Sequence, residues 1–235
     1  MVNVVNSLAA VKKLVDEEKY ISMKELNEAC LNNWQGNEKL HFKVTNAPKW
    51  GNNVDYVDDI YKELFDTYCI FVSEQKNYLG ETYDPSMLAI STHAPFGKVC
   101  GATPDGRYAG ETLCDGVTSP YPGTDTNGPL SVLLSAGKID HTRIRGGLHN
   151  MKFHPSVLNG INGSKKLLAL IKTYFESTGF QIQFNVVDSR MLKDAQLHPE
   201  KYRDLIVRVA GFSAYFVELG KTIQDEIIRR TEHVI

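Results

Sequence analysis

The chain has 235 residues, of which 42% are hydrophobic and 23% are charged, and its formal net charge is -2. This composition is typical of a globular protein with a packed core, and the length suits one large domain or two small ones. The small net charge excludes a strongly basic surface, so neither nucleic acid nor a membrane is an expected partner.

The sequence predicts a cytoplasmic protein with reduced thiols. No apolar run approaches the roughly 18 residues that cross a bilayer, and the first residues lack the charged and apolar regions of a signal peptide. The cysteines stand singly, without a C-x-x-C pair, which argues against a zinc knuckle or a redox dithiol. They are Cys30, Cys69, Cys100 and Cys114.

Helices are predicted over the first hundred residues. Apolar residues at helical spacing indicate an amphipathic helix over residues 7–18. Ser22 and Glu25 form a capping-box pattern for a second helix that runs to about Trp34. A third helix is indicated by an apolar stripe at Val54, Val57, Tyr61, Leu64 and Tyr68.

Residues 80–128 contain much of the glycine and proline and predict an ordered, irregular loop on the scaffold. Pro104-Asp105-Gly106 is a predicted turn, because proline presets φ and glycine accepts a positive φ. Asp105, Arg107 and Asp115 are candidates for acid–base work, although charged loop residues are usually solvated. The glycine spacing matches no phosphate-binding motif.

Alternating segments and helical patterns follow in the second half. Residues 148–154 predict a half-buried strand with Met151 and Phe153 on its apolar face. A helix is predicted over residues 164–177 and a strand over residues 180–186. Asp188 is the predicted N-cap of the next helix. A strand over residues 205–209 then leads to Gly211, and Thr222 is the predicted N-cap of the last helix. This order predicts an α/β or α+β layer or barrel.

The strand at 180–186 carries polar residues on one face, namely Gln181, Gln183 and Asn185. That face either contacts water or lines a polar interior, and the sequence leaves both alternatives open. Inside a barrel, these side chains would be candidates for the substrate side of the wall.

Gly211 interrupts an apolar and aromatic segment, Val207 to Phe216, where glycine would ordinarily weaken a strand. A bulge, a tight turn or a close backbone approach would explain it. A chemical role would also explain it, because only glycine can lose an α-hydrogen and flatten at Cα without driving a Cβ into its neighbours.

Other chemistries have weaker support. His149 and His154 are five positions apart, so on one strand they would face opposite sides, which disfavours a metal site shared with His141 and Cys114. No metal is therefore predicted. A cysteine nucleophile has no recognisable activating neighbours, and buried structural thiols are the usual case.

Several motifs together resemble the C-terminal part of the glycyl radical enzymes. Residues 208–213, Arg-Val-Ala-Gly-Phe-Ser, resemble the family's radical signature, with Gly211 at the radical position and Phe212 where tyrosine is usual. The other blocks occur in the family's order: residues 93–97, 101–107, 150–153, 183–188 and 224–228.

The resemblance implies an α/β fold that is an incomplete, C-terminal part of a ten-stranded barrel, made of two antiparallel halves surrounded by helices. Residues 1–103 would end the barrel domain, and residues 104–235 would form the glycine radical domain. Gly211 would be the catalytic residue, in a radical loop with Arg208, Val209, Ala210, Phe212 and Ser213. Gln183 and Asn185 would be candidate barrel-lining residues.

The implied mechanism needs a partner but no bound cofactor. A radical activase that uses S-adenosylmethionine and an iron–sulfur cluster would remove a hydrogen atom from Gly211. The glycyl radical would then generate a thiyl radical on a cysteine of an opposing loop. None of the four cysteines lies in the family's glycine-cysteine-valine type of loop, so we expect that cysteine in a missing N-terminal part or a partner chain.

Ala210 and residues 213–216 resemble the dehydratase, choline lyase and arylacetate decarboxylase branches more than pyruvate formate-lyase. The implied function is radical lyase or dehydratase chemistry on a small hydroxylated or aminated substrate. The alternatives are a non-catalytic or spare-part module that complements another chain, and formate acetyltransferase-like activity.

Overall fold

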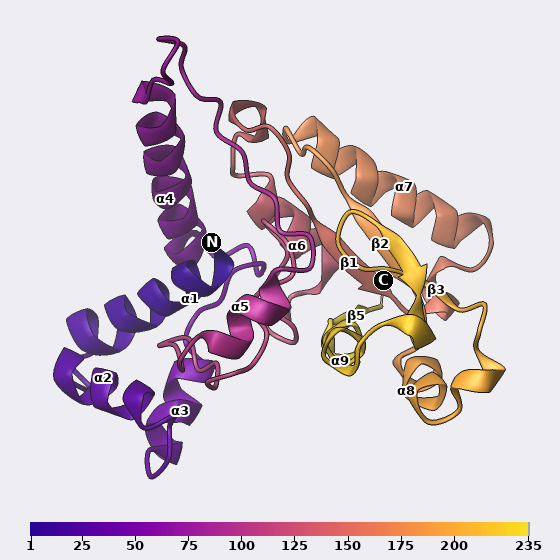
Figure 1. The fold of residues 1–235 in the computed structure, drawn as a ribbon, viewed down its shortest axis with the longest axis horizontal. Helices are drawn as coiled ribbons and strands as arrows, with labels where there is room; N and C mark the ends of the chain where they lie inside the picture. The colour runs from indigo at the N-terminus through magenta and orange to yellow at the C-terminus, as the bar shows by residue number, and fades with distance from the viewer. Residues whose placement is uncertain (235) are drawn as a thin grey trace.

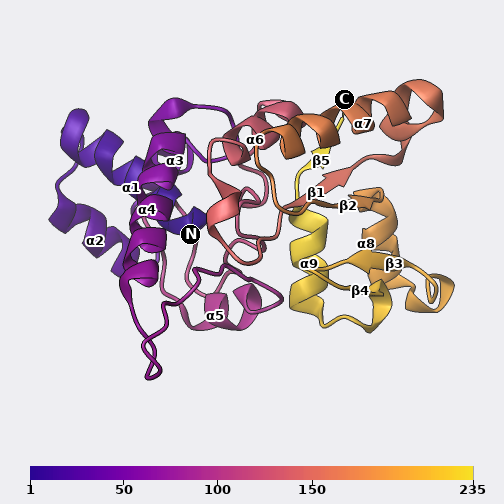
Figure 2. The ribbon, with the colours of Figure 1, turned by 90° about the horizontal axis from the view of Figure 1, so that it is seen from above.

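A computed structural model describes residues 1–234. Its elements form an N-terminal helical region and a C-terminal region built on a small parallel sheet, joined by a long irregular segment (Figure 1). Seen from above, the two regions lie side by side (Figure 2). Among the described residues, no helix is both long enough and apolar enough to cross a lipid bilayer.

The N-terminal helices confirm most of the predicted pattern. The capping box is present: Ser22 Oγ accepts from the Glu25 N–H at 3.2 Å, and Glu25 Oε2 accepts from the Ser22 N–H at 2.9 Å. The helix that carries the predicted apolar stripe is 20 residues long. The elements are α1 (Val2–Val11), a π-helix (Lys12–Glu17), α2 (Met23–Leu31), α3 (Glu38–Thr45) and α4 (Asp55–Glu74).

The first helix begins at Val2 rather than at residue 7, because buried asparagines extend it. Asn3 Nδ2 donates to Asp105 Oδ2 at 3.0 Å, and Asn6 Oδ1 accepts from the Trp50 N–H at 2.8 Å. These distant partners satisfy polar groups that a periodicity argument places on the surface. The apolar pattern alone therefore missed the first turn.

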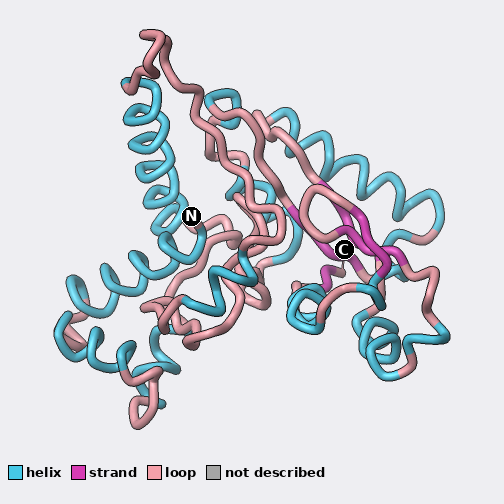
Figure 3. Tube along the Cα trace, viewed as in Figure 1, coloured by secondary structure: helices cyan, strands magenta, loops and turns pink. Residues whose placement is uncertain are grey.

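Residues 80–128 are largely irregular, as predicted, and are interrupted by the short helix α5 (His93–Val99), which the sequence pattern did not predict (Figure 3). Gly106 has φ +98°, which confirms the turn. Arg107 is buried and donates to the backbone oxygens of Gly101 and Glu111. Asp105 and Arg107 therefore organise this loop and are not solvated.

The parallel sheet has the order β2-β1-β5, with Asn150 opposite Gln183 and Phe153 opposite His233. Helix α7 (Gly160–Glu176) connects the first two strands and packs Leu170 and Tyr174 into the core shared with β1. The strands are β1 (Asn150–Phe153), β2 (Gln183–Val186) and β5 (Glu232–His233).

The prediction of a half-buried strand at residues 148–154 was wrong, since all four residues of β1 are buried. β1 is the central strand, with α7 on one face and α9 (Lys221–Arg229) on the other (Figure 1). Lys152, on the polar face, donates through Nζ to the Ile228 carbonyl oxygen at 2.8 Å. Burial lowers the pKa of Lys152 to about 8.

The remaining C-terminal elements form an antiparallel hairpin packed on two helices. Asp188 caps α8 as predicted, accepting from the Arg190 N–H at 2.7 Å. The predicted cap of the last helix was wrong, because Gly220 is the N-cap and Thr222 lies inside the helix. The elements are α8 (Ser189–Leu197), β3 (Ile206–Arg208), β4 (Ser213–Tyr215) and α9.

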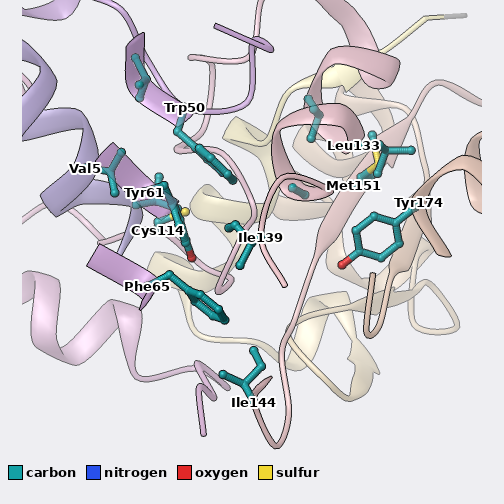
Figure 4. Packing of buried hydrophobic residues seen from close by; sticks show 14 of the residues in the cluster. Val5, Trp50, Tyr61, Phe65, Cys114, Leu133, Ile139, Ile144, Met151 and Tyr174 are labelled. Atoms are coloured by element: carbon teal, nitrogen blue, oxygen red, sulfur yellow. The ribbon is translucent and has the colours of Figure 1, made fainter. Parts of the chain in front are cut away.

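The main hydrophobic core joins the two regions (Figure 4). The rings of Trp50 and Tyr61 stack with their centroids 4.2 Å apart, and both rings donate to backbone oxygens of residues 117–118. Met151 and Tyr174 belong to the same cluster. The fold is therefore a mixed α/β piece whose regions share one core.

Candidate functional site

Gly211 lies in the turn between β3 and β4. The Val209 N–H donates to the Phe212 carbonyl oxygen at 2.9 Å, and Gly211 has φ +83°. A Cβ added there would lie 3.6 Å from Leu148 Cδ2, an ordinary contact. Backbone conformation, and not lack of space, therefore requires glycine in this turn, which confirms the tight-turn interpretation.

The turn is held by the polar face of β2. Gln183 Oε1 accepts from the Gly211 N–H at 3.2 Å and from Arg208 Nη2 at 2.9 Å. Asn185 bonds both the N–H and the carbonyl oxygen of Arg208, each at 2.8 Å. Both β2 side chains are buried. Gln183 and Asn185 therefore face the interior of the molecule, whereas Gln181, the third residue of the predicted polar face, is only partly buried.

A chain of hydrogen bonds continues from Gln183 into the molecule. Gln183 Nε2 donates to Asn150 Oδ1, and Asn150 Nδ2 donates to Asp115 Oδ2 at 2.6 Å. All three side chains are buried. The chain thus links the turn to Asp115, which precedes it by almost a hundred residues.

Arg230, the C-cap of α9, connects the same network to the backbone of the radical loop predicted at residues 208–213. Its guanidinium donates to the Val209 carbonyl oxygen at 2.8 Å and to the Arg208 carbonyl oxygen at 3.3 Å. It also lies 3.0 Å from Asp115 Oδ2 and forms two 2.8 Å hydrogen bonds to Glu226.

The charges of this network are buried together. Burial raises the pKa of Asp115. Burial would also raise the pKa of Glu226, but the Arg230 guanidinium outweighs it and lowers that pKa to about 2. His93 Nε2, on α5, lies 3.6 Å from Glu226 Oε2. Asp115 is therefore part of a buried ion-pair cluster that supports the turn, not an acid or base open to a substrate.

The tip of the turn is open on its other side. Gly211, Phe212 and Ser213 are exposed, with 39% of Phe212 accessible, whereas Val209 and Ala210 are buried. Arg208 Nη1 donates to Ser213 Oγ at 3.1 Å. The described residues alone do not enclose Gly211 in the dry interior that the resemblance implies.

The histidines and Cys114 do not converge on one site. His141 and His149 both pack against the ring of Tyr174, with centroids 5.9 Å and 5.4 Å away. The Cys114 thiol donates to the Ser119 carbonyl oxygen at 2.7 Å, and burial raises its pKa well above the ordinary value. A buried neutral thiol of this kind is a poor nucleophile.

His154 instead lies beside Asp188 and Glu232. His154 and Asp188 follow the carboxyl ends of β1 and β2, and Glu232 is the first residue of β5. The ligand-type atoms of this trio lie within 4.8 Å of one another. Each group already has a protein partner: Ser156 donates to His154 Nδ1, Arg190 to Asp188, and Ser189 to Glu232. Because the residues come from three separate segments, sequence spacing did not reveal the trio.

Two family models match the chain. The model described as "Glycine radical" matches residues 115–217, and the model described as "Pyruvate formate lyase-like" matches residues 1–97. The radical loop predicted at residues 208–213 lies inside the first match.

Similar proteins carry related names and are much longer. An indoleacetate decarboxylase of Tractidigestivibacter scatoligenes is 46% identical over 99% of this chain and 29% of its own length. A trans-4-hydroxy-L-proline dehydratase of Clostridioides difficile is 42% identical over 97% of this chain and 29% of its length. The chain therefore spans less than a third of these curated relatives.

Solved structures of larger enzymes also match this chain over its whole length. The hydroxyproline dehydratase of Clostridioides difficile, with its substrate bound, superposes with a TM-score of 0.96 at 41% identity. The B12-independent glycerol dehydratase of Clostridium butyricum superposes with a TM-score of 0.93 at 45% identity. Each match covers 100% of this chain and 30% of the larger one. The fold is that of the C-terminal part of these enzymes.

Proposed function

This chain belongs to the glycyl radical enzymes, and from that membership we propose that it stores an unpaired electron on the backbone of Gly211. The observation that carries the proposal is the position of this glycine. It lies at the exposed tip of a turn in which buried side chains hold the Gly211 N–H and the Val209 carbonyl oxygen. An activase can therefore reach the Gly211 Cα from the exposed side, while buried side chains hold the backbone on the other side.

The proposed step breaks one Cα–H bond of Gly211 homolytically. The hydrogen atom passes to an organic radical made by reductive cleavage of S-adenosylmethionine, for which the iron–sulfur cluster of a partner activase supplies the electron. The other electron of the bond stays on Cα, delocalised between the two flanking amides. A glycine Cα can become planar because no Cβ has to move.

Substrate chemistry requires a second residue. We propose that the glycyl radical generates a thiyl radical on a cysteine supplied by sequence outside this chain. None of the four cysteines of this chain lies in the glycine-cysteine-valine type of loop that the resemblance implies for the thiyl residue, and Cys69 and Cys114 are buried. We further propose residues 1–103 as the end of the barrel domain and residues 104–235 as the radical domain.

The proposed reaction is lyase or dehydratase chemistry on a small hydroxylated or aminated substrate, in the cytoplasm. The names of the relatives support a lyase, since they include a decarboxylase, a dehydratase and a sulfite-lyase. The side chains that contact a substrate would come largely from the rest of the barrel. Gln183 and Asn185 face the turn and are occupied by it.

A second candidate is a spare-part module that complements another chain and performs no turnover alone. The exposure of Gly211 favours it, because a stored radical needs a cover from outside these residues. Turnover by a mixture of this chain with an N-terminal portion of a glycyl radical enzyme that carries the cysteine loop, and by neither part alone, supports a complementing role.

Oxygen cleavage tests the storage site. The chain is activated anaerobically with an S-adenosylmethionine-dependent activase and then exposed to air. We expect backbone cleavage at Gly211, detected by intact-mass and peptide mass spectrometry. Cleavage at another glycine, or an intact chain after activation that consumes S-adenosylmethionine, would contradict the assignment.

A further inference from the structure

We propose that Gln183 is a positioning residue for the radical: its side-chain carbonyl holds the Gly211 N–H and so fixes the amide through which the radical is delocalised. This inference rests on the proposed storage of the radical at Gly211. It adds a residue outside the radical loop, on the neighbouring strand β2, whose role is to keep that radical long-lived.

The orientation of the Gln183 amide follows from its neighbours. Asp115 Oδ2 faces both Arg230 Nη2, at 3.0 Å, and Asn150 Nδ2, at 2.6 Å. A guanidinium has no acceptor, so this oxygen carries no proton, and the Asn150 atom facing it must be the donor nitrogen. Asn150 Oδ1 is then directed at Gln183 Nε2. The Gln183 oxygen is therefore left to accept from Gly211.

The two peptide groups before the glycine Cα are held from opposite ends of the network. Gln183 Oε1 accepts from the N–H of the Ala210–Gly211 peptide at 3.2 Å. Arg230 donates to the carbonyl oxygen of the Val209–Ala210 peptide at 2.8 Å. Since Asn150 and Asp115 connect the two side chains, a rotation of either peptide would break a buried hydrogen bond.

This geometry favours the radical for a simple electronic reason. Delocalisation of the unpaired electron at Cα requires that the neighbouring amide nitrogen stay in one plane with the trigonal carbon. An acceptor on the N–H keeps that plane and increases electron density on the nitrogen. The interaction is stronger beside a buried network than in water. Loss of the acceptor should therefore shorten the life of the radical.

The test compares two glutamines of the same strand segment. Gln183→Met has nearly the same length but no acceptor. The matched control is Gln181→Met, whose side-chain oxygen contacts the His149 N–H at 3.4 Å and does not touch the turn. In the unactivated chain, we expect Gly211 amide hydrogen exchange to be about fivefold faster in Q183M and unchanged in Q181M. Equal exchange rates in Q183M and the wild type would contradict the hydrogen bond between Gln183 and the Gly211 N–H.

Radical lifetime is measured next, by electron paramagnetic resonance after anaerobic activation and removal of the activase. We expect the signal of Q183M to decay at least about fivefold faster than the wild-type signal, and that of Q181M to match the wild type. An unchanged lifetime and line shape in Q183M would overturn the inference while leaving storage at Gly211 intact. If Q183M does not fold, Q183N, which withdraws the amide by one methylene, replaces it.

The two assays separate the two claims. If the wild-type chain gives no radical with an activase that is active on another substrate protein, the proposed function fails. The amide exchange comparison still decides whether Gln183 holds the Gly211 N–H, because it needs no radical.

Discussion

Gly211 satisfies two requirements that glycine alone meets. The turn needs φ +83°, a conformation that L-residues with a Cβ rarely adopt. The proposed radical needs a Cα that can become planar. The structure confirms the first requirement, and a substitution that separates structural cost from chemistry tests the second.

Gly211→Ala should cost about 1–2 kcal/mol of unfolding free energy, because the added Cβ has room but the backbone is strained. Gly123→Ala is a matched control: Gly123 also has φ +83°, and its N–H also donates to a side-chain oxygen at 3.2 Å. Urea unfolding should show similar losses in both variants. Only G211A should lose oxygen-dependent cleavage at position 211, and cleavage there in G211A would contradict the radical assignment.

His149 should make the fold acid-sensitive. Burial lowers its pKa to about 3, whereas the unfolded chain has a histidine pKa of about 6.5. Between these values the unfolded chain binds a proton that the folded chain does not, so the free energy of unfolding decreases as the pH falls. From pH 7 to pH 5, His149 should account for a loss of about 2 kcal/mol.

The check for His149 is urea unfolding at pH 7 and pH 5. His149→Gln, which retains a polar group beside the Thr118 hydroxyl, should reduce the difference between the two pH values. An equally large difference in this variant would show that other groups cause the acid sensitivity.

At the scale of elements, α9 connects the sheet to the turn. Its C-cap, Arg230, bonds Asp115, Glu226 and the carbonyl oxygens of Arg208 and Val209. Helix α9 also packs Ile227 against Val207 and Val209 of the hairpin. Arg230 adds the buried guanidinium that bonds the backbone of the turn. The contribution of Arg230 to stability can be measured on the unactivated chain, without forming a radical.

Arg230→Met should lower the free energy of unfolding by about 3–5 kcal/mol, because it leaves two buried carboxylates without their cation. Lys221→Met removes an exposed i,i+4 ion pair with Asp225 on α9. This variant should change the free energy of unfolding by at most about 0.5 kcal/mol. The two variants are compared by urea unfolding. A loss below about 1 kcal/mol in R230M would contradict the assignment of Arg230 as the central support of the turn.

Local patterns predicted the elements that depend on local interactions. The sequence predicted three such features: the capping box at Ser22, the apolar stripe on α4 and the alternation along β2. Each of them reflects contacts within a few residues or the burial of one face. The sequence did not predict helix α5, because Pro95 and Gly97 within it are residues that disfavour a helix. A Cβ at Gly97 would lie 2.3 Å from the Glu111 carbonyl oxygen, so packing against a distant loop determines that glycine.

The site was only partly predictable for the same reason. A radical loop was predicted from the residues around Gly211, and Gln183 was named as a polar-face residue. Asp115 and Arg230 were not linked to the turn, because their contacts join separate segments: Asp115 and Arg230 are more than a hundred residues apart, and α9 lies between Arg230 and the turn that it bonds. No local periodicity records such pairings, and the burial of Lys152 on the polar face of β1 likewise depends on α9.

At the scale of the whole molecule, the chain is a connected α/β piece that spans less than a third of its relatives. The turn at Gly211 is held by buried side chains of the same chain and is exposed at its tip. This arrangement predicts that the piece can hold a radical but needs further sequence to protect it and to act on a substrate.

Addition of an N-terminal portion of a glycyl radical enzyme that carries the cysteine loop should slow the oxygen cleavage of the activated chain, because it would cover the exposed tip. The rate is followed by gel electrophoresis after a timed exposure to air. An unchanged rate, with complex formation verified by size-exclusion chromatography, would contradict a covering role for that portion.

The most direct measurement of the central claim is electron paramagnetic resonance of the anaerobically activated chain. A radical at Gly211 Cα retains one α-hydrogen, so we predict a doublet. The doublet should collapse to a single line when the chain is made with α-deuterated glycine, and it should be absent from Gly211→Ala but present in Gly123→Ala. A signal that survives in G211A, or a doublet that does not respond to deuteration, would contradict storage of the radical on Gly211.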